Sequence, residues 1–264
     1  MQEPPEVDLI GTRVLITGST SGLGRAMAGA LAAAGAWVVV TGRDATRARA
    51  VATEVGTRSG RTLGLALDVR EPASVQAGVA AAISELGGLD VLINNAGLGM
   101  RSVNPNFLTQ AQPFWAVSPD GFRDLVDTNL TGYFLMARQV VPHFLGQQHG
   151  RIVNVTMNQA TMRRRGFVPY GPARAGADAL SEIMAADLAD TPITVNQLLP
   201  GGATATGMIP ADTPAEIRAR LLPSNVMDRA ICWLCSQAAS DVRNQRIVAT
   251  GFDQWLVEWE AGTP

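Results

Sequence analysis

Val14-Leu15-Ile16-Thr17-Gly18-Ser19-Thr20-Ser21-Gly22-Leu23-Gly24 joins an apolar, β-branched run to a glycine-rich turn. A helix rich in alanine and leucine is expected to follow from Leu23 to Ala34, with Gly35 as its stop signal. In such a strand–turn–helix unit, glycines let the backbone approach a phosphate, and the helix N-terminus presents free N–H groups. The stretch therefore predicts a dinucleotide pyrophosphate site. Its Gly-x3-Gly-x-Gly spacing differs from the commonest fingerprint, and glycine turns also occur for conformational reasons alone.

The rest of the chain alternates short apolar strands with helical patterns. Strands are expected at Val14–Ile16, Trp37–Thr41, Leu63–Val69, Val91–Ile93, Arg151–Val155, Ile193–Leu199 and Arg246–Ala249, and helices notably at 44–55, 71–86, 119–145, 171–189 and 226–238. This alternation predicts right-handed βαβ crossovers and a parallel sheet with helices on both faces. No composition shift or internal repeat divides the chain. We expect one α/β domain over residues 1–264, a doubly wound Rossmann-type sheet of about seven strands.

Composition argues against several classes of partner. The formal net charge of −2 and the pI of about 5.7 favour neither nucleic acid nor an anionic membrane. The N-terminal tail, residues 1–8, is acidic and proline-rich, unlike a secretory signal. Cys232 and Cys235 are interpreted as small buried side chains, since no second ligand pair lies nearby for a metal or redox site. We expect a reduced cytoplasmic protein without a metal, acting on a small-molecule substrate.

Polar residues follow the predicted strands, where ligands bind in a parallel sheet. They are Asp68-Val69, Asn94-Asn95-Ala96-Gly97, Asn154-Val155-Thr156-Met157-Asn158 and Pro200-Gly201-Gly202, with Tyr170-x3-Arg174 between the last two groups. Together with the glycine turn and Asp127-Thr-Asn129-Leu-Thr-Gly, they make the chain resemble the short-chain dehydrogenase/reductase family over nearly its whole length. The resemblance implies hydride transfer between a nicotinamide and a carbonyl or alcohol carbon, in a homotetramer or homodimer.

The resemblance also implies a set of cofactor-binding residues. They are Gly18, Ser19, Ser21, Gly22, Leu23, Gly24, Arg43, Asp68, Val69, Asn95, Ala96, Gly97, Tyr170, Arg174, Pro200, Gly201 and Ala203. Asn95 is also expected to tie adjacent strands together.

Two departures from the family pattern concern the chemistry. The family motif after the tyrosine ends in lysine, whereas here it ends in Arg174, one helical turn beyond Tyr170. A cation favours the phenolate of a nearby tyrosine, so we expect Tyr170 to act as general acid/base and Arg174 to tune it, with an altered ribose contact. The alternative is an ordinary tyrosine and a solvated arginine on a surface helix.

The second departure is at the family serine, thirteen residues before the tyrosine, where this chain has Met157. That serine donates a hydrogen bond to the substrate oxygen, and losing such a donor typically lowers the rate by about 10²–10³. Thr156 or Asn158 could replace it, and Asn158 is a competent donor. Otherwise the usual reaction is not performed efficiently.

The resemblance gives Asn129 the role of holding a water in a proton relay. The alternative is a helix asparagine that bonds only to its neighbours.

Cofactor choice is decided after the second strand. An acidic residue there would select NAD(H), but the chain has Gly42 followed by Arg43. A guanidinium suits a 2′-phosphate, so NADP(H) is expected. Asp44 is expected to cap the next helix.

Four segments bear on the substrate or on oligomer assembly. An inserted loop at 103–117 with Phe107, Phe114 and Trp115 forms a pocket wall or lid, or else a packing or subunit contact. Arg163-Arg164-Arg165 is a solvated or subunit face, or else meets an anionic substrate group. A substrate loop is expected at 203–225, and the aromatic C-terminal tail, 252–264, is expected to be an oligomer contact.

The sequence therefore predicts an NADP(H)-dependent oxidoreductase for a carbonyl or alcohol of a small polar substrate. The alternative is a relative that binds NADP(H) with lost or altered redox chemistry, as a non-redox catalyst or cofactor sensor.

Overall fold

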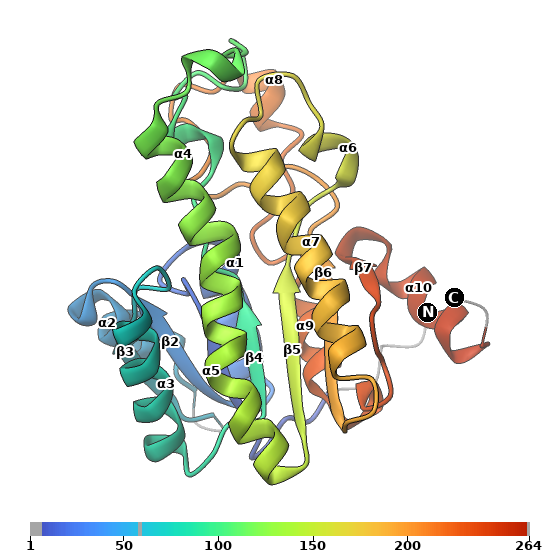
Figure 1. Cartoon of the computed structure of the whole chain (residues 1–264). Helices are drawn as coiled ribbons and strands as arrows, with labels where there is room; N and C mark the ends of the chain where they lie inside the picture. Colours follow the sequence, from blue (N-terminus) through green and yellow to red (C-terminus); the bar gives the residue numbers. More distant parts are fainter. Residues whose placement is uncertain (1–6, 58–59, 263–264) are drawn as a thin grey trace.

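The strands of one parallel sheet run in the order β3-β2-β1-β4-β5-β6-β7 in this computed structural model, which describes residues 7–57 and 60–262 (Figure 1). Residues 1–6 of the predicted tail lie outside the described residues, as do 263–264. The strands are β1 Arg13–Ile16, β2 Trp37–Gly42, β3 Thr62–Ala66, β4 Val91–Asn94, β5 Gly150–Val155, β6 Ile193–Leu199 and β7 Arg246–Val248. The predicted seven-stranded doubly wound sheet is confirmed.

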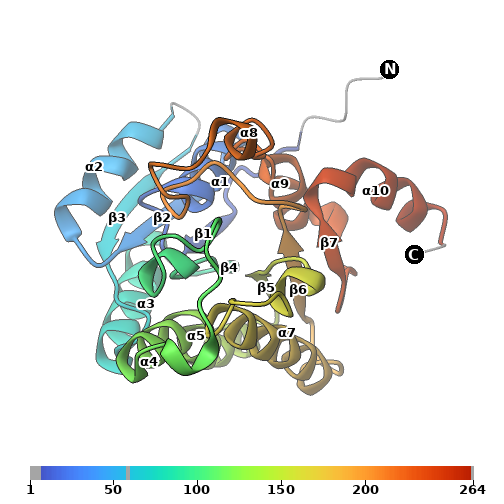
Figure 2. The ribbon, with the colours of Figure 1, turned by 90° about the horizontal axis from the view of Figure 1, so that it is seen from above.

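Helices cover both faces of the sheet (Figure 2). Alternate side chains of β1 point to opposite faces, so Val14 and Ile16 pack into one core and Leu15 into the other. The first core is covered by α1 (Gly22–Ala33), α2 (Ala45–Val55) and α9 (Asp228–Cys235), and the second by α3 (Pro72–Leu86), α5 (Gly132–Gln147) and the end of α7 (Tyr170–Asp187).

Shorter helices gather where the strands end. Figure 1 shows α4 (Pro119–Val126), α6 (Gln159–Met162) and α8 (Ala215–Arg218) beyond the carboxyl end of β5. This is the edge at which a parallel sheet binds ligands.

The predicted helix 119–145 is interrupted. α4 ends at Val126, and a π-helical turn, Asp127–Thr131, separates it from α5. Such turns insert an extra residue and often mark functional positions. Here the turn carries Asn129, whose side chain accepts a hydrogen bond from the Leu98 N–H at 2.7 Å and donates to the Leu98 carbonyl at 2.9 Å.

Two other elements are shorter than expected for local reasons. β3 ends at Ala66 and not at Val69, and the Asp68 N–H then donates to the Ser74 hydroxyl. The helix expected at 226–238 begins at Asp228 and ends at Cys235, because Ser236 adopts an extended backbone.

The C-terminal segment forms α10 (Phe252–Glu260) at the β7 edge of the sheet (Figure 2). Trp255 and Trp259 stack with ring centroids 5.5 Å apart, and Trp255 meets Trp233 of α9 edge-on at 5.7 Å. These rings pack against the core, while Val257 is exposed. An oligomer contact through this helix stays a prediction.

Cys235 is buried and Cys232 half-buried, and burial raises the pKa of both thiols, that of Cys232 to about 12. The prediction of small buried side chains is confirmed for Cys235. Within residues 7–57 and 60–262, no helix is both long and apolar enough to span a bilayer.

Candidate active site

The glycine turn after β1 is shaped by contacts that exclude side chains. A Cβ on Gly18, whose φ is +62°, would lie 2.7 Å from the Cα of Ala96. A Cβ on Gly24 would lie 2.4 Å from the Nδ2 of Asn95. The turn is therefore pressed against the residues that follow β4, and two of its glycines are required there.

Asn95 and Thr17 hold these two strand ends together. The Asn95 amide donates to the carbonyls of Thr17, at 2.9 Å, and Gly18, at 3.0 Å. In return, the Thr17 hydroxyl accepts from the N–H groups of Asn95 and Ala96 at 2.9 and 3.0 Å. The prediction that Asn95 ties adjacent strands together is confirmed.

The N-terminus of α1 differs from that of α2. Asp44 caps α2, as predicted, by accepting from the N–H groups of Thr46 and Arg47 at 2.8 and 3.0 Å. Ser21 precedes α1 without making any side-chain cap bond. The first-turn N–H groups of α1 thus stay available at the positive end of the helix dipole, which is where an anionic phosphate binds.

A cavity of about 600 Å³ runs from this turn to Tyr170. Its walls include every predicted cofactor-binding residue except Ser19. Ser19 is fully buried, where its hydroxyl donates to the Ile16 carbonyl and accepts from the Thr41 N–H. The other sixteen come together in one place, and an elongated dinucleotide fits this donor set.

The far end of the cavity, beside β2 and β3, is rich in guanidinium groups. Arg43 lines it, as does Arg70, which the sequence analysis did not single out. Arg70 donates to both carboxylate oxygens of Asp68, at 3.1 and 2.8 Å, and holds the pKa of that carboxyl below its usual range. A Cβ at Gly42 would lie 2.7 Å from the Thr20 methyl group, so an acid there would require the Thr20 side chain to move.

Arg174 is buried at the opposite end, 3% exposed. Its Nη1 donates to the Tyr133 hydroxyl at 2.7 Å and to the Val155 carbonyl at 2.8 Å. A Cβ on Gly97 would lie 2.4 Å from its Nη2, so the glycine leaves the space that the guanidinium fills. Tyr170 is half-buried beside it, with its ring centroid 5.5 Å from the guanidinium carbon. The alternative of a solvated surface arginine is wrong.

The three candidates at the end of β5 have different environments. The Thr156 hydroxyl is buried and bonds to the carboxylate of Asp178. Met157 lines the cavity, and its carbonyl accepts from Arg246, which also pairs with Asp178 at 3.4 Å. The Asn158 amide lines the cavity and donates to the Gly201 carbonyl at 3.0 Å. Thr156 also lines the cavity, but its hydroxyl donor is engaged with Asp178.

Asn129 lies behind the cavity wall. It is fully buried and bonded to the Leu98 backbone, while its neighbour Thr128 lines the cavity. Its Oδ1 is 3.2 Å from the position of a Gly97 Cβ, which places it on the same side of Gly97 as Arg174.

An aromatic wall stands at the cavity mouth. Phe167 meets Phe107 edge-on at 6.1 Å and Tyr170 at 6.5 Å, and the Arg164 guanidinium lies 5.1 Å from the Phe167 ring centroid. Phe107 and Arg164 line the cavity, so part of segment 103–117 forms a pocket wall. Phe114 and Trp115, by contrast, are 67% and 76% exposed. Phe167 was missed because no sequence pattern links it to Phe107.

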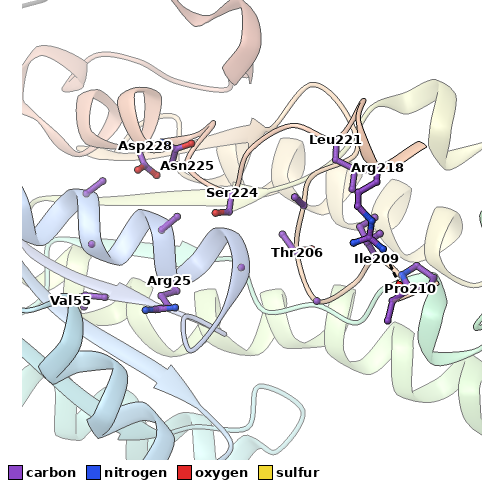
Figure 3. A pocket seen from close by; sticks show the side chains of 17 residues that line it. Arg25, Val55, Thr206, Ile209, Pro210, Arg218, Leu221, Ser224, Asn225 and Asp228 are labelled. Atoms are coloured by element: carbon purple, nitrogen blue, oxygen red, sulfur yellow. Dashed lines mark hydrogen bonds between the residues drawn. The ribbon is translucent and has the colours of Figure 1, made fainter. Parts of the chain in front are cut away.

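A second cavity, of about 830 Å³, is lined by residues of α1 and of segment 203–225 (Figure 3). Thr206 and Ile209 of that segment line both cavities. Asp228 and Asn225 lie side by side in its wall, and the Asp228 Oδ1 finds no hydrogen-bond partner among the described residues. Burial raises the pKa of Asp228 to about 6.

Comparison with known proteins assigns the chain to a family. The family model described as short chain dehydrogenase matches residues 12–216. The chain belongs to this family. It is 30% identical over 248 residues to the 3-oxoacyl-(acyl-carrier-protein) reductase FabG of Escherichia coli (strain K12), covering 91% of this chain and 96% of that relative. It is 36% identical over 187 residues to the (2S)-((R)-hydroxy(phenyl)methyl)succinyl-CoA dehydrogenase subunit BbsD of Thauera aromatica, covering 71% of each.

Solved structures agree with this assignment. The 3-ketoacyl-(acyl-carrier-protein) reductase from Brucella melitensis complexed with NADH is 32% identical, with a TM-score of 0.79 and coverage of 91% of this chain and 97% of that chain. A dehydrogenase/reductase from Sinorhizobium meliloti 1021 is 26% identical, with a TM-score of 0.78 and coverage of 92% and 95%. The chain is an oxidoreductase of this family with a site for a nicotinamide cofactor.

Proposed function

We propose that this protein is an NADP(H)-dependent carbonyl reductase or alcohol dehydrogenase for a small polar substrate. When bound, the nicotinamide supplies or accepts the hydride. Tyr170 donates a proton to the substrate oxygen, or accepts it in the reverse direction, and the buried guanidinium of Arg174 favours its phenolate. The observation that carries the proposal is this cation 5.5 Å from the ring centroid of a tyrosine that lines the cofactor cavity.

The preference for NADP(H) is supported at the guanidinium-rich end of the cavity. Arg43 lines the wall where an NAD-selecting acid would stand one residue earlier, and a Cβ at Gly42 would require the Thr20 side chain to move. A 2′-phosphate carries negative charge that Arg43 would pair with. NADH has no such group.

Asn158 is the proposed donor to the substrate oxygen in place of the family serine. Its amide lines the cavity and, among the described residues, donates one hydrogen bond, to the Gly201 carbonyl. An amide has two N–H donors, so one is left for the substrate. Asn129 keeps its proposed relay role, and a homotetramer or homodimer in the cytoplasm stays a prediction.

Arg164 and the aromatic wall support a substrate with an anionic group as well as a carbonyl. Relatives named for 3-oxoacyl and succinyl-CoA substrates make thioesters of 3-oxo acids a reasonable addition to a test panel. The panel would hold ketones, aldehydes, sugar acids and a 3-oxoacyl thioester, with NADPH consumption as the readout. Turnover of any of them supports the proposal.

The deciding variant is Tyr170→Phe. General acid/base catalysis contributes about 10²–10⁴-fold, so we expect turnover to fall by that factor while NADPH still binds. Fluorescence titration of NADPH provides the control. Turnover at the wild-type rate in this variant would make the assignment wrong.

A second candidate function is favoured by Met157 and by the engagement of Thr156 with Asp178. A protein of this fold without a donor to the substrate oxygen would bind NADP(H) as a sensor or support a non-redox step. It would show tight NADPH binding with no consumption across the whole panel.

A further inference from the structure

Both tyrosines of this chain face the same arginine. The sequence contains two tyrosines, and the guanidinium carbon of Arg174 lies 5.5 Å from the ring centroid of each. Tyr170 lines the cavity, whereas Tyr133 is 1% exposed and lies on the inner side, in α5. The proposed function uses Tyr170 and Arg174 but gives no role to Tyr133.

Tyr133 bonds to the arginine in a closed arrangement. Its hydroxyl donates to the Val155 carbonyl at 2.9 Å and accepts from Arg174 Nη1 at 2.7 Å. The same Nη1 also donates to the Val155 carbonyl at 2.8 Å. Because the phenol proton is given to the carbonyl, the phenol oxygen is free to accept from the guanidinium. Each of the three groups thereby fixes the other two.

The arginine has no carboxylate to hold it. Within residues 7–57 and 60–262, Arg174 forms no salt bridge, and the nearby Asp178 is paired with Thr156 and Arg246. A buried cation without a counter-ion is costly and moves toward any available acceptor. Here the compensating groups include the Tyr133 hydroxyl, the Val155 carbonyl and two aromatic rings. Removing the Tyr133 hydroxyl therefore removes one of the acceptors that hold the guanidinium.

The contact depends on arginine. A lysine ammonium at position 174 would end where the guanidinium carbon stands, one bond short of Nη1. It would also lack the planar fork that reaches two acceptors at once. The Tyr133 hydroxyl is thus matched to the residue that replaces the family lysine.

We propose that Tyr133 is a positioning residue: its hydroxyl orients the guanidinium of Arg174 so that a fixed cation is presented to Tyr170. The inference rests on the proposed function. Burial raises the pKa of Tyr133, so this phenol stays neutral and acts only through the hydrogen bond. Tyr133 is buried and is not among the residues that line the cavity.

The test is a double-mutant cycle with Tyr133→Phe and Arg174→Lys, measured on a substrate from the panel. Tyr133→Phe should lower kcat about tenfold, the typical effect of losing a hydrogen bond to a charged group. In the Arg174→Lys background the same substitution should have little further effect. An equal fold-loss in both backgrounds would overturn the proposal, because Tyr133 would then act independently of the arginine.

Met136→Leu on the same helix is the matched control. Met136 is fully buried, and the exchange conserves volume, so kcat should stay near the wild-type value. If it lowers kcat as Tyr133→Phe does, the effect comes from helix packing and the proposal fails.

An arm without substrate separates this inference from the proposed function. In nitrogen-15-labelled protein, the Arg174 Nη groups should give separate NMR signals in the wild type, because bonds to Tyr133 and Val155 stop rotation about Nε–Cζ. Tyr133→Phe should bring rotation back and merge the signals. A freely rotating guanidinium in the wild type would overturn the inference even if Tyr170→Phe abolishes turnover. Separate Arg174 Nη signals together with an active Tyr170→Phe variant would support the positioning role of Tyr133 and refute the proposed function.

Discussion

At the glycine turn the cavity wall consists of backbone at positions without side chains, whereas at the end of β5 it consists of side chains that bond to one another. Gly18 and Gly24 leave no space for a Cβ, and the ligand-facing groups there are backbone N–H groups. At the other end, Thr156 bonds to Asp178, and Arg174 to Tyr133. The sequence motifs predict that the first region keeps the family pattern and that the second departs from it.

The comparison teaches where substitution is tolerated. A backbone site allows little change, because any added atom meets the opposite strand end. A site made of paired side chains can accept a change at one position where a partner elsewhere still bonds to the new side chain, as Tyr133 bonds to Arg174. Adding a side chain at the glycine turn, or removing one elsewhere in the cavity wall, tests this difference between the two kinds of site.

The largest of these effects is expected at Asn158. Replacing it with alanine removes the proposed donor to the substrate oxygen and should lower kcat by about 10²–10³-fold. Met157→Ser is the matched comparison: if Asn158 already supplies the donor, the serine should bring no large gain. A strong gain in Met157→Ser, with an active Asn158→Ala variant, would place the donor at position 157 and contradict the proposal.

Adding a methyl group at the turn should weaken cofactor binding. The Cβ of Gly24→Ala would lie 2.4 Å from the Asn95 Nδ2 and 2.7 Å from the Gly18 carbonyl, so the turn must shift. Overpacking of this kind costs about 1–3 kcal/mol, which corresponds to an affinity for NADPH lower by about ten- to a hundredfold.

Gly29→Ala is the control on the same helix. Its nearest neighbour is the Val55 methyl at 4.0 Å, and the exchange should raise the free energy of unfolding by about 0.5–1 kcal/mol. Similar NADPH affinities in the two variants would show that the turn is not the constrained region.

A smaller effect is expected at the adenosine end. Arg43→Ala should lower the affinity for NADPH about tenfold and leave NADH binding unchanged, since a charge-assisted hydrogen bond is lost with one cofactor only. Arg47, exposed on α2 and outside the cavity walls, gives the control Arg47→Ala. Isothermal titration calorimetry with NADPH and with NADH measures both affinities for the wild type and the two variants. Tighter binding of NADH than NADPH by the wild type would refute the cofactor assignment.

The same contrast explains what could be predicted from the sequence. The strands and the cofactor-binding residues follow from apolar runs, glycines and strand ends, which are local signals. The π-helical turn at Asn129, the Phe107–Phe167 contact and the partners of Arg174 are set by elements distant in the chain. Tyr133 is one residue beyond the Asp127–Gly132 motif, yet its role depends on Val155 and Arg174, which lie on other elements.

The smallest expected effect lies outside both regions, at Asp228 in the wall of the second cavity. Burial raises the pKa of this carboxyl from 3.8 to about 6, so the folded protein binds its proton more tightly than the unfolded chain. The contribution of Asp228 to the stability of the folded protein should therefore fall as the pH rises from about 4 to about 6, and the loss is complete above that range.

Asp228→Asn removes this ionisation. The variant should unfold at a higher temperature than the wild type at pH 7 and show a smaller difference at pH 4. Because the carboxyl is partly exposed, solvent screening keeps the gain below about 1–2 kcal/mol. NADPH affinity and turnover should not change, since Asp228 does not line the cofactor cavity. If they do change, segment 203–225, which lines both cavities, transmits the effect. The active site would then depend on the second cavity.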